Sequence, residues 1–156
     1  MSKFNIVISQ VENKKTVHIE GVLDEDFIFS KYPLSEADEV EFFLGKLKNI
    51  NSCGIREWIN WMGTIKSVKI KLIECPKIIV DQINMVQGFI SKNALVESFY
   101  VPYFNEEAGT EKNVLFSLGK EYTNSEINFP KEITDESGRP MELDVIESKY
   151  FKFLKK

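Results

Sequence analysis

The stretch LGKLKNINSCGIREWINWMGTIK, from Leu44 to Lys66, carries the most structural information in the chain. It runs from a strand pattern through the polar turn Asn51-Ser52-Cys53-Gly54 into an amphipathic helix. One face of that helix is apolar at intervals of three and four residues, at Ile55, Trp58, Ile59, Met62 and Ile65. The first backbone N–H groups of a helix lack partners within it, so we expect this turn to be the functional site.

Strand patterns flank this unit on both sides. Before it, residues 4–22 predict a hairpin, and residues 40–47 predict a third strand that is apolar on both faces. After it, a fourth strand at 68–75 leads to a second helix that starts at Pro76, and a fifth strand is predicted at 96–104. The fourth strand should bury Val68, Ile70 and Leu72.

The order of these elements predicts the fold class. A hairpin followed by strand–helix units with short links is typical of α/β proteins whose later strands are parallel and joined by right-handed crossovers. We therefore expect one mixed β-sheet with helices packed on one face. Beyond Phe104 the sequence becomes rich in turns, so the chain should divide into an α/β domain at 1–104 and a small β-rich extension at 105–156.

The composition and charge of the chain limit the classes of protein to which it can belong. The chain has 156 residues, 43% hydrophobic and 28% charged, with a net charge of −4, which is typical of a globular protein that does not attract nucleic acid or anionic membranes. The N-terminal apolar run is too short for a signal peptide, and no run reaches the length of a membrane span. Cys53 and Cys75 fit no disulfide or metal pattern. We expect a cytoplasmic protein without a cofactor, and the sequence leaves its oligomeric state open.

The residues at the joints between elements resemble those of the STAS domain, the module shared by sulfate transporters and bacterial anti-sigma-factor antagonists. Val17-His18-Ile19-Glu20-Gly21-Val22-Leu23-Asp24 is similar to the family's second strand with its Gly-x-Leu-Asp signature. Asn51-Ser52-Cys53-Gly54-Ile55 is similar to its Asp-Ser-Ser-Gly-Leu turn, and Glu74-Cys75-Pro76 to the passage from the fourth strand into the next helix. The resemblance covers residues 4 to 104 and implies a STAS-like fold.

The resemblance implies protein–protein signalling rather than catalysis. In the family, a partner kinase phosphorylates a hydroxyl in this turn, where the helix dipole stabilises the added charge, and the phosphate blocks partner binding. Here Asn51 replaces the family's aspartate and Cys53 the phosphorylated residue, with Ser52 one position earlier, so the phospho-switch is left open. We expect a protein partner, such as an anti-sigma-type kinase, to bind the turn. The expected flanking surface is Asp24, Arg56 and Glu57.

The extension resembles a zinc ribbon that has lost its four cysteines. Asn105 and Ala108 form one pair, Thr134 and Ser137 form the other, and each pair is followed by a glycine. In metal knuckles such a glycine lets backbone N–H groups approach the thiolates. With no ligand left, the resemblance implies no metal binding. An ordinary β-rich tail with turns at the two glycines explains the same residues.

Two other functions can be built on the same turn. A small-ligand or nucleotide-binding regulatory domain would use the free N–H groups of the helix. A thiol enzyme would use Cys53, but a phosphatase loop needs an arginine where Ile59 stands, and a thiol protease needs a histidine, of which His18 is the only one. We therefore expect no enzymatic activity.

Two tryptophans lie three residues apart on the predicted helix. Trp58 belongs to its apolar face. Trp61 is either an exposed binding hot spot or, as we expect, partly buried under the C-terminal extension.

Overall fold

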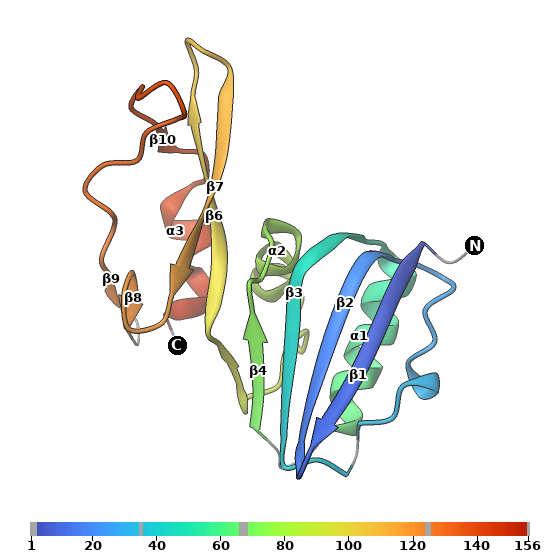
Figure 1. Ribbon diagram of the computed structural model, residues 1–156. Helices are drawn as coiled ribbons and strands as arrows, with labels where there is room; N and C mark the ends of the chain where they lie inside the picture. Colours follow the sequence, from blue (N-terminus) through green and yellow to red (C-terminus); the bar gives the residue numbers. More distant parts are fainter. Residues whose placement is uncertain (1–2, 35, 66–68, 124–125, 156) are drawn as a thin grey trace.

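The structure is a computed structural model that describes residues 3–34, 36–65, 69–123 and 126–155. It contains a five-stranded sheet followed by smaller β-rich elements (Figure 1). In the view of Figure 1 the five-stranded sheet is on the right with a helix behind it, and the C-terminal elements lie on the left. The chain is therefore a mixed α/β protein with an additional β-rich part, as its sequence predicts.

The five strands of the large sheet lie side by side in chain order. They are β1 (Phe4–Val11), β2 (Lys14–Leu23), β3 (Glu39–Ile50), β4 (Lys69–Ile73) and β5 (Ala94–Val96). β1 and β2 form the expected antiparallel hairpin, and every later pair is parallel. The predicted burial of Ile70 and Leu72 is confirmed, whereas Val68 lies outside the described residues.

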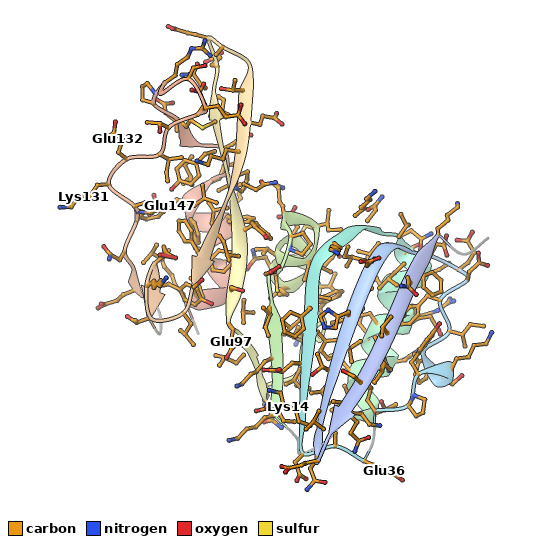
Figure 2. The ribbon with its side chains drawn as sticks, viewed as in Figure 1. Lys14, Glu36, Glu97, Lys131, Glu132 and Glu147 are labelled. Carbon is orange, nitrogen blue, oxygen red and sulfur yellow. The ribbon has the colours of Figure 1, made fainter. Side chains whose placement is uncertain are left out.

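Two helices cover one face of this sheet. They are α1 (Ser52–Thr64) and α2 (Lys77–Met85). Phe42 of β3 packs against Trp58 of α1 with ring centroids 5.1 Å apart, and Trp58 stacks on Phe89, which follows α2, at 5.5 Å. The opposite face stays open and carries His18 stacked on Phe43 at 4.6 Å. Figure 2 shows Lys14 near the start of β2, where it pairs with Glu41 of this open face at 2.8 Å.

The loop between β2 and β3 closes over α1. Its described residues include a 3-10 turn, η1 (Phe29–Lys31). Trp61 is fully buried beneath this loop: its Nε1 donates to the Tyr32 carbonyl at 2.7 Å, and its ring meets that of Phe27 at 5.3 Å. Both expectations for Trp61 are wrong, because its side chain is buried under apolar residues of this loop and not under the C-terminal extension.

The C-terminal part forms two small sheets and short helical turns. Its elements are β6 (Ser98–Asn105), β7 (Thr110–Ser117), β8 (Tyr122–Thr123), β9 (Glu126–Ile127), β10 (Glu142–Leu143), α3 (Glu147–Tyr150) and η2 (Lys152–Leu154). The order β10-β6-β7 makes a three-stranded antiparallel sheet, and β8 pairs with β9.

The predicted fifth strand at 96–104 is interrupted at Glu97. Up to Val96 the chain pairs with β4, and from Ser98 it belongs to the second sheet. The Glu97 N–H donates to the Leu72 carbonyl at 2.9 Å, while its carboxylate lies 3.4 Å from the Lys71 ammonium. Figure 2 shows Glu97 where the two sheets meet. The division at 104/105 stays a prediction, but the hydrogen-bonded sheets change over at Glu97.

The two sheets share one core. Cys75 bridges to Phe99, and both are fully buried. The Tyr122 hydroxyl donates to the Val96 carbonyl, and the Tyr150 hydroxyl donates to the carbonyl of Tyr100. Burial raises the pKa of the Cys75 thiol and of both tyrosine hydroxyls, so all three groups are neutral at pH 7.

Candidate functional site

The turn at 51–54 is built around the side chain of Asn51. Asn51 is the N-cap of α1, and its Oδ1 accepts the Gly54 N–H at 2.9 Å. Its Nδ2 donates to the carboxylate of Glu25 at 3.1 Å, and its backbone N–H donates to the Leu23 carbonyl at 3.1 Å. One residue therefore joins the end of β2, the following loop and the start of α1, which makes the turn rigid.

Gly54 brings the helix close to β2. A Cβ atom on this residue would lie 2.2 Å from the Leu23 carbonyl oxygen and 3.0 Å from Cγ1 of Ile50. No larger side chain fits at these distances. The helix N-terminus is consequently pressed against the end of β2, and glycine is required here by packing rather than by backbone conformation.

Cys53 lies in this turn, and the large sheet lies between it and His18. The thiol is partly buried. His18 belongs to β2, where its neighbours Val17 and Ile19 are buried beneath α1 and the imidazole itself stacks on Phe43 of the opposite, open face. The sheet therefore separates the only histidine from Cys53, and a Cys–His pair cannot form in this fold.

Three carboxylates surround the start of α1. Asp24 is 3% exposed; its Oδ1 accepts the Asp26 N–H at 3.0 Å, and its Oδ2 lies 3.9 Å from the Lys3 ammonium. The Oε1 of Glu57 accepts the Phe29 N–H at 3.1 Å. Hydrogen bonds from its own backbone N–H and then from Asn51 hold the pKa of Glu25 below its ordinary value. These charges oppose an anion at the helix N-terminus.

The exposed part of the site is a small mixed surface. Asn51, Ser52 and Arg56 are exposed on the turn and helix, and Glu25 and Ile28 are exposed on the loop beside them. Ile28 is 41% exposed, next to the Phe29 N–H that binds Glu57. Figure 1 shows that α1 starts at the edge of the sheet remote from the C-terminal elements, which leave this surface uncovered.

The structure separates the predicted site residues into two groups. Ser52 and Arg56 form surface, as expected, whereas Asp24 is buried and supports the loop instead of flanking the turn. The sequence analysis missed Glu25 and Ile28. Glu25 stands in an acidic run that has the pattern of a solvated loop, and Ile28 is identified only by its exposure in the folded chain.

The four positions of the zinc-ribbon resemblance lie in two neighbouring turns. Oδ1 of Asn105 accepts the Ala108 N–H at 2.9 Å, and its Nδ2 donates to the Pro140 carbonyl at 2.8 Å. The second turn is held by Asp135, next to Thr134: its Oδ1 accepts the Ser137 and Arg139 N–H groups, both at 2.9 Å. Oγ1 of Thr110 bridges to this carboxylate at 3.0 Å.

Side-chain oxygens thus accept backbone N–H groups in both turns, as thiolates do in metal knuckles. Gly109 and Gly138 have φ values of 65° and 80°, which favour glycine. Within the described part of the chain, no group of three or more histidine, cysteine, aspartate or glutamate residues is arranged to hold a metal ion.

Comparisons with known proteins leave the family open. No protein-family model matches the chain, and no curated protein matches its sequence. Among the described helices, none is both long enough and apolar enough to cross a membrane.

Proposed function

We propose that this chain is a non-enzymatic bacterial signalling module of the STAS type, which binds a partner protein in the cytoplasm through the turn at 51–54. The observation that carries the proposal is a rigid, uncovered turn beside an exposed aliphatic side chain. Asn51 fixes the turn, and Ile28 offers an apolar anchor within a polar rim formed by Glu25, Ser52 and Arg56. Protein interfaces commonly combine these two features.

The proposed partner is an anti-sigma-type kinase or a related regulator. Phosphorylation is a separate question, because Cys53 stands where the STAS resemblance places the hydroxyl. Ser52 supplies an exposed hydroxyl in the same turn, but a phosphate there would add negative charge beside the Asn51–Glu25 hydrogen bond. The proposal therefore concerns binding first and the phospho-switch second.

A nucleotide or another small anionic ligand has less support at this site. The Gly54 N–H already donates to Asn51, so one of the amides that could hold a phosphate is occupied. Asp24, Glu25 and Glu57 place negative charge around the others. A thermal-shift screen with nucleotides checks this alternative, since a ligand at a hundred times its Kd raises stability by about 2.7 kcal/mol.

Direct binding to purified kinases of the anti-sigma type tests the proposal. We expect a complex with at least one of them in biolayer interferometry, and we expect Ile28→Asp to weaken it at least tenfold. Val11→Asp is the matched control, because Val11 is also an exposed aliphatic residue, 74% exposed, but lies on β1. Equal loss in the two variants, or no complex with any kinase, would argue against the proposed partner.

Intact mass spectrometry after incubation with the binding kinase and ATP tests the switch. The STAS resemblance predicts that Cys53→Ser gains a phosphate that the wild type lacks. If the wild type is modified instead, Ser52→Ala identifies the acceptor, because it removes the neighbouring hydroxyl. Circular dichroism of each variant controls for folding.

A further inference from the structure

A pocket of about 600 Å³ lies between the end of α2, the segment after it and η2. Its apolar wall is formed by Ile83 of α2, by Ile90, and by Phe153 of η2. All three are partly buried and pack against the core, so the wall is part of the folded structure. These elements contribute no residue to the turn at 51–54.

The charged groups that line this pocket are all lysines, namely Lys92, Lys152 and Lys155. Each is exposed, and among the described residues none of them has a carboxylate oxygen within 4.0 Å. The chain as a whole carries a net charge of −4. The pocket is therefore a local basic site on an acidic protein, and it favours a negatively charged occupant.

Two polar atoms of residues beside the pocket have no hydrogen-bond partner among the described residues. They are Oδ1 of Asn84 and Oγ of Ser91, and both atoms are buried. The Nδ2 of Asn84 donates to the Tyr150 carbonyl at 2.8 Å, which fixes the amide and leaves its oxygen as an acceptor. Both atoms are closed off from solvent, so they lie under the pocket and not on the surface that an occupant would contact.

We propose that the pocket binds an acidic peptide segment of a partner protein. One apolar side chain of the peptide would pack on Ile83, Ile90 and Phe153, and its carboxylates would pair with the three lysines. An anionic lipid carries the same sign of charge, and the vesicle experiment described below distinguishes it from a peptide. This second interaction surface goes beyond the function proposed for the turn.

Selection from a random-peptide display library on the full chain tests the proposal. We expect the enriched peptides to combine aspartate or glutamate with large apolar residues. A labelled peptide from the selection should lose about tenfold or more in affinity, by fluorescence anisotropy, when Lys92→Glu, Lys152→Glu and Lys155→Glu are combined.

The matched control combines Lys48→Glu, Lys120→Glu and Lys131→Glu, three exposed lysines away from the pocket that give the same change in net charge. We expect this variant to bind the peptide within twofold of wild type. Equal loss in the two triple variants, enrichment of peptides without acidic residues, or no enrichment at all would overturn the proposal. It would also be overturned if the pocket lysines were needed for cosedimentation with phosphatidylserine vesicles or for self-association in sedimentation velocity, because the occupant would then be a lipid or a second copy.

Discussion

Gly54 and Gly63 lie on the same helix in opposite environments. A Cβ on Gly54 would meet the Leu23 carbonyl oxygen at 2.2 Å, whereas a Cβ on Gly63 would meet nothing within 4 Å. We expect Gly54→Ala to destabilise the protein by about 1–3 kcal/mol through this clash. Gly63→Ala should stabilise it by about 0.5–1 kcal/mol, since alanine has the higher helix propensity.

Urea unfolding of both variants checks this prediction, with tryptophan fluorescence as the signal. The comparison is internal, because the same substitution is made twice in α1. Two changes of the same sign would contradict the packing described for the turn.

The Asn51 side chain gives a second prediction at this scale. Asn51→Ala removes both the cap on Gly54 and the hydrogen bond to Glu25, and the loss of a cap costs about 1 kcal/mol. The pKa of Glu25 should rise toward its ordinary value, though not fully, because its own backbone N–H is the larger cause of the lowering. NMR titration of the Glu25 carboxylate measures the change.

The lowered pKa of Glu25 determines how the stability of the protein changes with pH. A carboxyl group whose pKa is lowered by folding stabilises the native state above its unfolded pKa, and this contribution is lost as the pH falls through the folded pKa. The wild type should therefore lose more stability than Asn51→Ala between neutral and acidic pH. An identical pH dependence in the two proteins would show that the Asn51–Glu25 hydrogen bond has no energetic role.

The first four strands of the large sheet and its two helices could be predicted from sequence, but the short fifth strand, β5 (Ala94–Val96), could not. The periodicity after Ser52 and the alternation before Cys75 locate α1 and β4 because each pattern is local. Residues 96–104 also read as one strand, yet the chain changes sheets at Glu97, because hydrogen-bond partners far along the chain decide which sheet a strand joins. The burial of Trp61 under the loop was not predicted either, because Phe27 lies in a loop whose sequence has no periodic pattern.

The two turns of the extension give a prediction at the scale of elements. Asn105 and Asp135 hold them through acceptor oxygens, and Thr110 joins them. If these turns have knuckle geometry, cysteines at positions 105, 108, 134 and 137 together should bind one zinc ion in tetrahedral thiolate coordination. Cobalt substitution and the resulting visible absorption spectrum measure the coordination.

The control for this experiment places the second pair of cysteines at 136 and 139 instead, with the first pair unchanged. We expect much weaker zinc binding, because the spacing to Gly138 is then altered. Equal binding by the two variants would remove the support for a zinc-ribbon geometry and leave an ordinary β-rich tail.

At the scale of the whole molecule, the two sheets should unfold together. Both tryptophans lie on α1 beneath the first sheet, whereas Tyr122 lies on β8 and donates to the carbonyl of Val96 on β5. Tyr122→Phe leaves that carbonyl unpaired and should cost about 0.5–1.5 kcal/mol. Because the core is shared, the loss should lower the unfolding midpoint measured by tryptophan fluorescence.

Tyr103→Phe is the control, since Tyr103 is also buried and on the second sheet. No hydrogen bond of its hydroxyl is recorded among the described residues, so we expect a smaller effect. A tryptophan transition that does not respond to Tyr122→Phe would mean that the sheets unfold independently.

The single crossing at Glu97 has a consequence for biosynthesis. In the part of the chain that the structure describes, every strand of the first sheet precedes this residue and every strand of the other sheets follows it. On the ribosome, the N-terminal sheet can therefore pair its strands before the remaining chain has left the exit tunnel, and no later segment must thread back between them. Contacts with later residues, such as that of the Tyr150 hydroxyl with the Tyr100 carbonyl, form once those residues have emerged.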